Sequence, residues 1–184
     1  MNEFKVYDIS NAPSESRVHL EKIKLKQGSL PNVYGVMAES PVLLQGHAAL
    51  KELFAKTSLT TQERKIVLLT ISRENESPYC ISVYSGVAER HKVPADVVEA
   101  VRTGAPLKDN KLEALRTFTA KVVVGRGQVE DSDIKSFLDA GCTRANILEI
   151  VLAVGMATLT NYTNLIAETS LDAQFEPKVW KKAG

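Results

Sequence analysis

The stretch TTQERKIVLLTISRENESPYCISVYSGVA, residues 60–88, predicts two helices that meet at a short polar turn. Thr60 and Glu63 have the spacing of a capping box, in which each side chain accepts a hydrogen bond from the other residue's backbone amide. Apolar residues between 66 and 71 then give this helix a broad hydrophobic face. Residues 74–76 are polar and form the turn. The stretch therefore predicts a pair of antiparallel helices.

The second helix of this pair carries a cysteine near its start. Ser77 can serve as its N-cap and Pro78 as its first residue, because a capping hydroxyl and a fixed φ suit those positions. Cys80 then falls at about the third helical position, where unpaired amides and the helix dipole favour a thiolate. The alternative interpretation is that Cys80 is a small buried hydrophobe, which is the common role of an unpaired cysteine in an apolar helix.

Length and composition indicate a single globular domain. The chain has 184 residues, of which 44% are hydrophobic, and this is enough for a sizeable core. The net charge of +1 does not indicate the excess of positive charge that proteins use to bind nucleic acid or an anionic membrane surface. The N-terminus has no apolar signal region, and no segment reaches the roughly 18 apolar residues of a membrane span. We expect a soluble protein without nucleic-acid or membrane partners.

The cysteines and histidines do not form a recognisable framework. Cys80 and Cys142 are far apart, without disulfide or zinc-site spacing, so we expect a reducing, cytoplasmic setting and a packing role for Cys142. His19, His47 and His91 have no metal-ligand spacing with any partner, and we expect each at the surface. The sequence accordingly predicts no metal and no cofactor.

Helical patterns also account for most of the remaining chain. The expected ranges are 33–39, 41–56, 94–102, 110–124, 130–140 and 143–168. No segment combines period-two alternation with hairpin turn residues, so the predicted fold class is all-α. Asn161 and Asn164 lie within the last apolar helix, where we expect them to satisfy a helix end or a subunit contact.

The two ends of the chain carry weaker signals. Residues 1–29 are predicted to form an extended N-terminal arm with a weakly marked helix inside residues 16–26, and residues 30–184 to form the helical domain. The C-terminal tail is irregular, and we expect Phe175 and Trp180 to anchor it on the body of the domain.

The residues around the turn resemble the alkylhydroperoxidase D (AhpD) and carboxymuconolactone decarboxylase family, whose core segment runs helix, Asn, Cys-x-x-Cys and then His. The corresponding run here is Asn75-Glu76-Ser77-Pro78-Tyr79-Cys80-Ile81-Ser82-Val83-Tyr84, with Ala88 also matching. Similar segments occur at 30–33, 40–41, 141–149 and 161–164, so the resemblance covers roughly residues 30–177. It implies an AhpD-like helical domain that assembles as a homo-oligomer, commonly a trimer or hexamer.

The sequence departs from the redox-active members of this family at most chemical positions. Ser77 stands where the first cysteine would be, Tyr84 where the histidine would be, and Lys65 where active members carry a proton-relaying glutamate. Only Cys80 is retained. Without a thiol three residues away, a sulfenic acid on Cys80 cannot close a local disulfide, so its reduction needs an external thiol or Cys142.

The resemblance implies a thiol-dependent, peroxidase-like oxidoreductase, an antioxidant activity of peroxiredoxin type, that uses Cys80 alone. The Cys80 thiolate would attack a peroxide, with Lys65 stabilising the anion and Tyr84 assisting the leaving oxygen. With an ordinary pKa of about 10, Tyr84 can donate a hydrogen bond but is a poor base at neutral pH. The candidate catalytic residues are Cys80, Tyr84, Lys65 and Ser77.

Two alternatives remain open at this stage. The first is a decarboxylase-like lyase or isomerase acting on a small carboxylated lactone, in which Lys65 binds the carboxylate and Cys80 is incidental. The second is a non-catalytic oligomer that acts as a binding or structural protein. For Lys65 itself, the alternative to a role in the site is a solvated surface lysine. The expected partners are therefore a small molecule, either a peroxide or a carboxylate, an external thiol reductant and further copies of the chain.

Overall fold

The computed structural model describes residues 4–181; residues 1–3 and 182–184 lie outside the described part. The elements are α1 (Ser14–Gln27), α2 (Asn32–Met37), α3 (Pro41–Phe54), α4 (Thr61–Glu74), α5 (Pro78–Arg90), α6 (Ala95–Thr103), α7 (Asn110–Val124), α8 (Asp131–Asp139), α9 (Arg144–Ala167) and the short 3₁₀ segment η1 (Ala173–Lys178). No strand occurs in the described residues, and the predicted all-α class is confirmed. The predicted helix boundaries differ from these by only a few residues.

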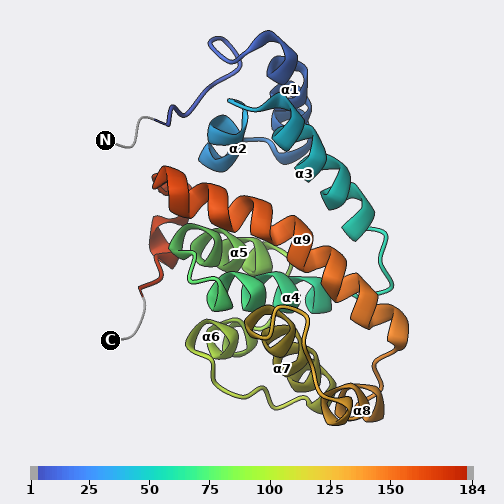
Figure 1. Cartoon of the computed structure of the whole chain (residues 1–184). Helices are drawn as coiled ribbons and strands as arrows, with labels where there is room; N and C mark the ends of the chain where they lie inside the picture. The colour runs from blue at the N-terminus through green and yellow to red at the C-terminus, as the bar shows by residue number, and fades with distance from the viewer. Residues whose placement is uncertain (1–3, 182–184) are drawn as a thin grey trace.

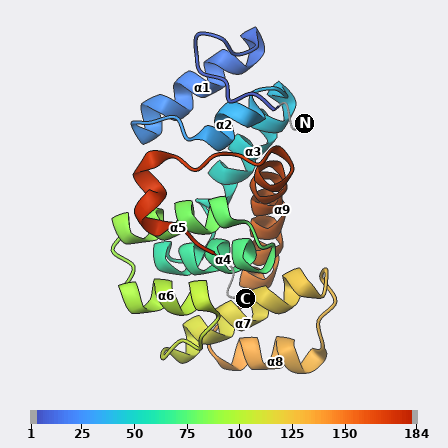
Figure 2. The same ribbon diagram turned by 90° about the vertical axis from the view of Figure 1, so that its left-hand side faces the viewer.

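Helix α4 lies in the middle of the molecule (Figure 1). Helices α5 and α9 run along one side of it, and α6 and α7 lie on the other. Helices α1, α2 and α3 cover α9 and α5 at one end, and α8 lies beyond α7 at the opposite end (Figures 1 and 2). The two helices that the sequence marks most strongly are therefore also the centre of the fold.

The start and end of α4 follow the predicted signals. The Thr60 hydroxyl accepts from the Glu63 amide at 3.2 Å, and the Glu63 carboxylate accepts from the Thr60 amide at 2.7 Å, which confirms the capping box. The helix ends at Glu74 with Asn75 as its C-cap, and Glu76 adopts a left-handed φ of 51° that turns the chain. The Ser77 amide then donates to the Ser72 carbonyl at 3.0 Å, closing the predicted turn.

Burial of α4 extends around the whole helix, because every residue from 66 to 72 is buried. Val67, Leu68 and Ile71 join a core with α7, α8 and α9. Ile66 and Leu69 join a second core with α5 and α6. A helix that is apolar on all sides must be enclosed by other elements to remove that surface from water.

The N-terminal segment packs against the rest of the chain. Residues 4–13 are not helical, and α1 follows over a longer range than its weak sequence signal suggests. Leu20 of α1 is fully buried in a third core formed with α2, α3 and α5. The Ser16 hydroxyl donates to the Ala38 carbonyl at 2.7 Å. The division into an arm, residues 1–29, and a domain, residues 30–184, stays a prediction.

The C-terminal tail is anchored by the two predicted aromatic residues. Phe175 is buried against Gly86 of α5, and the Trp180 ring nitrogen donates to the Arg102 carbonyl at 3.1 Å. Asp172 adds two contacts, accepting from the Tyr79 hydroxyl at 2.6 Å and from the Asn32 amide at 3.0 Å. The tail therefore holds α2 and α5 in place.

Helix α9 is the one described helix whose length and apolar composition would allow it to cross a membrane. Its inner face contributes Ile150, Ala153, Met156 and Ala157 to the core with α4. That packing is typical of the central helix of a globular protein.

We expect truncation of Ile71 to destabilise the fold strongly. Ile71 is fully buried at the centre of the molecule, so Ile71→Ala should lower the free energy of unfolding by about 2–5 kcal/mol. The matched control is Leu25→Ala, since Leu25 is 87% exposed and its truncation should change stability by no more than about 0.5 kcal/mol. Urea unfolding followed by circular dichroism measures both, and equal losses would contradict the central role of α4.

Candidate active site

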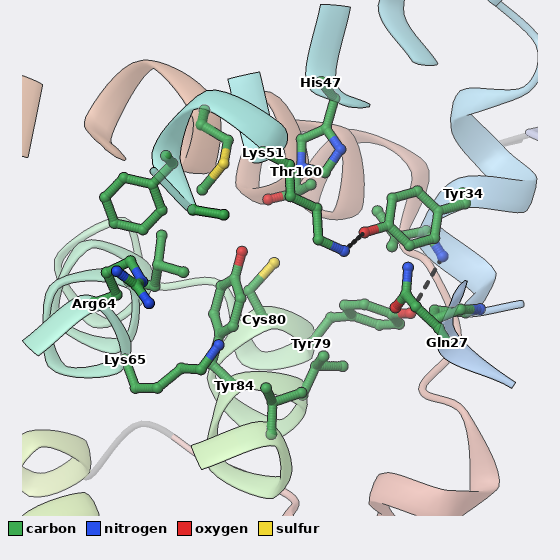
Figure 3. A pocket seen from close by; sticks show the side chains of 18 residues that line it. Gln27, Tyr34, His47, Lys51, Arg64, Lys65, Tyr79, Cys80, Tyr84 and Thr160 are labelled. Atoms are coloured by element: carbon green, nitrogen blue, oxygen red, sulfur yellow. Dashed lines mark hydrogen bonds between the residues drawn. The ribbon is translucent and has the colours of Figure 1, made fainter. Parts of the chain in front are cut away.

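A pocket of about 180 Å³ opens beside the start of α5 (Figure 3). It lies among α2, α3, α4, α5 and α9, with the end of α1 at its edge. Three of the four predicted site residues, Lys65, Cys80 and Tyr84, line it together. Tyr84 also packs against all three hydrophobic cores, so the pocket lies where these cores meet.

Cys80 presents its sulfur to this pocket from the first turn of α5. Its side chain is almost completely buried, and the Asn164 amide of α9 donates to the sulfur at 3.2 Å. Burial raises the pKa of Cys80 above its ordinary value, while contacts with Ser77, Asn164, Asn161 and Thr160 act in the opposite direction. The expectation of an acidic thiol at the helix start is therefore wrong, because desolvation outweighs the helix dipole here.

Ser77 occupies the N-cap position of α5, as the sequence predicts, but its hydroxyl makes no capping hydrogen bond. The side chain is fully buried, and its hydroxyl has no hydrogen-bond partner within residues 4–181, although it acts to lower the pKa of Cys80. Ser77 does not line the pocket. Its predicted catalytic role stays a prediction.

Tyr84 follows Cys80 by one helical turn and points into the same pocket (Figure 3). Burial raises the pKa of Tyr84 strongly, and the nearby Cys80 adds to this rise. The phenol is therefore neutral at physiological pH. It can donate a hydrogen bond to a bound oxygen, as expected, and cannot act as a base.

Lys65 enters the pocket from α4 and is half-buried, so the alternative of a fully solvated surface lysine is wrong. Burial lowers the pKa of Lys65 to about 8, helped by the positive charges of Lys51 and Arg64. No acidic partner of Lys65 occurs among the described residues. Lys65 is also not among the groups that shift the pKa of Cys80.

Three pocket residues on α2 and α3 escaped the sequence analysis. The Lys51 ammonium donates to the Tyr34 hydroxyl at 2.9 Å, and the Tyr34 ring lies 5.6 Å from the His47 ring, centroid to centroid. A signal was present, because His47 and Lys51 fall between Leu44 and Phe54 at spacings of three and four residues. Both side chains therefore lie on the apolar, inward face of α3.

His47 is buried rather than exposed at the surface, so the prediction for this histidine is wrong. Burial lowers the pKa of His47 to about 4, and the positive charge of Lys51 adds to this effect. Its Nδ1 atom has no hydrogen-bond partner within residues 4–181. His91 is exposed as expected, whereas His19 is half-buried.

A buried polar cluster connects Cys80 to the turn after α4. Asn75, the C-cap of α4, donates to the Asn161 side chain at 2.9 Å, and Asn161 donates to the Ser72 hydroxyl at 3.2 Å. Asn161 therefore bonds side chains near the end of α4 rather than the backbone of a helix end. The prediction for Asn164 is wrong, because its amide contacts the Cys80 sulfur instead.

The other cysteine has a packing role. Cys142 is buried in the core with α4, α7, α8 and α9, which confirms its predicted packing role. In the described part of the chain, no three His, Cys, Asp or Glu side chains lie together as metal ligands.

The pocket thus combines a buried thiol, neutral hydrogen-bond donors and unbalanced positive charge. Lys51, Arg64 and Lys65 are its charged residues, and no aspartate or glutamate lines it in the part that the structure describes. The remaining wall is mostly apolar, with contributions from Phe54, Leu68, Val83, Val87 and Met156. Such a site can hold a small apolar molecule against a nucleophile and can stabilise negative charge on it.

The fold is that of the AhpD-like proteins. A peroxidase-related protein from Ralstonia eutropha with an alkylhydroperoxidase AhpD core superimposes with a TM-score of 0.81 and 21% identity over 97% of both chains. A peroxidase-related protein from a Silicibacter species gives a TM-score of 0.80 with 20% identity, covering 96% of this chain and 93% of that one. These similarities confirm the predicted AhpD-like architecture.

The same architecture occurs in an enzyme of different chemistry. The debrominase Bmp8, as a cysteine-to-alanine variant in complex with 2,3,4-tribromopyrrole, superimposes with a TM-score of 0.78 and 17% identity over 97% of this chain and 96% of that one. No protein-family model matches the sequence, and no curated protein matches it. At these identities the similarities define the fold alone.

Stability should depend on pH through His47. In the unfolded chain this histidine takes up a proton near pH 6.5, whereas in the folded protein it does so only near pH 4, so protonation favours unfolding between these values. Lowering the pH from 7 to 4 should therefore cost on the order of 3 kcal/mol at this site.

The measurement is urea unfolding at both pH values, comparing His47→Gln with the exposed control His91→Gln. His47→Gln should reduce the pH-dependent loss by that amount, because glutamine does not titrate. If the wild-type protein and His47→Gln lose the same free energy of unfolding between pH 7 and pH 4, the pKa of His47 is not lowered in the folded protein, and the prediction is wrong.

Proposed function

We propose that this protein is a thiol-dependent, peroxidase-like oxidoreductase in which Cys80 reacts with a small molecule bound in the pocket. The observation that carries the proposal is the placement of the Cys80 sulfur in the wall of a partly enclosed, mostly apolar cavity. The Asn164 amide fixes that sulfur, and Tyr84 and Lys65 face the same space. A nucleophile, hydrogen-bond donors and a cation are thus available at one site.

With an organic hydroperoxide the chemistry balances without a second thiol on this chain. Attack by the sulfur forms an S–O bond and breaks the O–O bond, and the thiol proton ends on the released alcohol. Cys80 is oxidised to a sulfenic acid, while the peroxide is reduced. Tyr84 and Lys65 stabilise the departing oxygen. Two molecules of an external thiol then reduce the sulfenic acid, releasing water and a disulfide.

The buried position of Cys80 decides how this reaction can begin. Its raised pKa keeps the thiol protonated at neutral pH, so the site is protected from non-specific oxidation and alkylation. Reaction then depends on a substrate that enters the pocket and on the positive charge available there. The AhpD-like neighbours are peroxidase-related proteins, and the debrominase complex places a small ring in the same architecture. Both support a small-molecule reaction at this fold.

Replacement of Cys80 should abolish turnover. With cumene hydroperoxide as substrate and dithiothreitol as reductant, Cys80→Ser should reduce peroxide consumption to the uncatalysed rate, because serine cannot form the sulfenic acid. Cys142→Ser is the matched control and should leave the rate unchanged, since Cys142 does not line the pocket. Dimedone labelling read by mass spectrometry should mark Cys80 in the wild-type protein.

The second candidate function is a lyase acting on a small carboxylate, favoured by the unbalanced charge of Lys65 and Lys51 in the pocket. A turnover that survives Cys80→Ser and disappears in Lys65→Ala would support the lyase and contradict the thiol mechanism. If neither Cys80→Ser nor Lys65→Ala affects the measured turnover, a binding protein becomes the better explanation of the pocket. The predicted cytoplasmic location fits the need for an external thiol, since that compartment keeps thiols reduced.

We also propose that a second copy of the chain packs on the outer face of α9, as the predicted homo-oligomer requires. Leu148, Val151, Tyr162 and Leu165 form an exposed apolar row on one side of this helix, with Gly155 open between them. No charged residue occurs from position 150 to 167. A monomeric soluble protein rarely leaves so continuous an apolar face in water.

A charge placed in this row should disrupt the oligomer. Val151 is 54% exposed, so Val151→Glu should leave the monomer folded and convert the oligomer to monomers, because burying an unpaired charge is costly. Leu25→Glu is the control, at an exposed position on α1. Size-exclusion chromatography with light scattering measures the mass, and a wild-type protein that is monomeric at micromolar concentration contradicts the proposal.

A further inference from the structure

We propose that Lys65 is a second nucleophile of the pocket and binds small apolar aldehydes covalently as imines. In this reaction the free amine of Lys65 adds to the carbonyl carbon and forms a C–N bond. Both amine protons then leave with the carbonyl oxygen as water, so the step needs no oxidant and no reductant. The inference goes beyond the proposed function, because the reacting atom is the Nζ atom of Lys65 rather than the sulfur of Cys80.

The position of Lys65 in the cavity is the first support. Its side chain extends from α4 and lines the partly enclosed pocket, with the amine end turned toward the cavity (Figure 3). The residue is half-buried. Apolar side chains supply most of the surrounding wall, namely Phe54, Leu68, Val83, Val87 and Met156. The amine is therefore held next to the space in which a small molecule can bind.

The charges around Lys65 are the second support. A lysine in an ion pair keeps its proton and is not a nucleophile. No aspartate or glutamate lines the pocket in the described residues, and its two other charged side chains, Lys51 and Arg64, are also cations. The Lys51 ammonium donates to the neutral Tyr34 hydroxyl at 2.9 Å, so it is not paired with a carboxylate there. Like charges at this distance disfavour the protonated form of Lys65.

The ionisation of Lys65 agrees with this environment. Burial, together with the positive charges of Lys51 and Arg64, lowers the pKa of Lys65 to about 8. At pH 7 roughly one such side chain in ten carries a free amine, against on the order of one in a thousand or fewer for a lysine of ordinary pKa. Desolvation in an apolar pocket and an adjacent cation are two ways in which proteins activate a lysine as a nucleophile. Both act on Lys65.

A neutral hydrogen-bond donor is available for the carbonyl oxygen. Tyr84 lines the same pocket, and burial raises its pKa strongly, so its hydroxyl keeps its proton at neutral pH. This hydroxyl can donate to the oxygen of the aldehyde as the amine of Lys65 attacks, where negative charge develops. The chain thus supplies both a nucleophile and a donor for the same carbonyl group.

The size of the cavity sets the class of aldehyde. A cavity of about 150 Å³ lined by apolar side chains holds benzene, and this pocket has about 180 Å³. There is room for one six-membered ring that carries a formyl group. An aldehyde of this kind has no charge, so the cations of the pocket neither attract nor repel it, and its ring can pack against the apolar wall.

Reductive trapping with benzaldehyde and sodium cyanoborohydride tests the proposal in the full-length wild-type protein. Cyanoborohydride reduces an imine to a stable secondary amine and does not fix an adduct of the aldehyde with a thiol. Peptide mass spectrometry then gives the labelling rate of each lysine. At pH 7 Lys65 should be labelled roughly tenfold or more faster than the exposed Lys22. The rate at Lys65 should also level off as the benzaldehyde concentration rises, because the aldehyde binds in the pocket before it reacts.

The labelling rate of Lys65 should depend on pH with a midpoint near 8, increasing as the amine loses its proton. The titratable and charged side chains that share the pocket with it are Arg64 on α4, His47 and Lys51 on α3, Tyr34 on α2, and Tyr79, Cys80 and Tyr84 on α5. The pKa of His47 is lowered to about 4, and burial raises the pKa of Tyr79, Cys80 and Tyr84. A midpoint near pH 8 therefore belongs to Lys65 rather than to these four groups.

Variants connect the labelling to the cluster of cations. Lys51→Met should slow labelling of Lys65 at pH 7 by about two- to fivefold and move its midpoint upward, because one neighbouring positive charge is removed. Lys56→Met removes an exposed charge of the same region that does not line the pocket, and it should change neither value. Lys65→Arg should lose the fast adduct from the intact-mass spectrum. Cys80→Ser, with folding verified by circular dichroism, should keep it.

The inference is overturned if Lys65 is labelled no faster than Lys22, or if Lys56→Met slows the labelling as much as Lys51→Met. Loss of the fast adduct in folded Cys80→Ser also overturns it, since the amine alone is then not sufficient. The outcome is independent of the proposed function. Imine formation without peroxide turnover removes the peroxidase activity and leaves the Lys65 site, and peroxide turnover without fast labelling of Lys65 does the reverse.

Discussion

Enclosure of α4 on every side is the constraint from which the rest of the structure follows. Seven consecutive residues of this helix, 66–72, are buried, so no face is left for solvent. Removing that much apolar surface from water needs partners in several directions. Helices α5, α6, α7 and α9 supply them, and α1, α2 and α3 close one end. The capping box of Thr60 and Glu63 fixes where this central helix begins.

The position of the pocket is a consequence of this arrangement. The three hydrophobic cores meet around Tyr84, and side chains from different helices do not fill the space at their junction. The same junction receives Cys80 from the first turn of α5 and Lys65 from the first turns of α4. A short turn joins these two helices, so thiol and ammonium come to one cavity although fifteen positions of sequence separate them.

Electrostatics give this pocket a character different from the dithiol sites that the sequence resembles. Where the resemblance predicts a glutamate there is Lys65, and Lys51 and Arg64 add to the positive charge. The thiol itself is held protonated by burial, and its nearest polar contacts are neutral, with Asn164 as a direct donor. Burial lowers the pKa of both Lys65 and His47, and the positive charge of Lys51 adds to the lowering of each.

Local signals determined the secondary structure of this protein, the paired helices at the turn and the shared face of Cys80 and Tyr84. Caps, prolines and helical periodicity act within a few residues and can be seen directly in the chain. The ionisation of Cys80 and the burial of His47 were decided by tertiary structure, because desolvation depends on helices that arrive from elsewhere. The pocket joins Lys51, Lys65 and Cys80 only when α3 packs against α9 beside the central pair, and no spacing in the sequence encodes that arrangement.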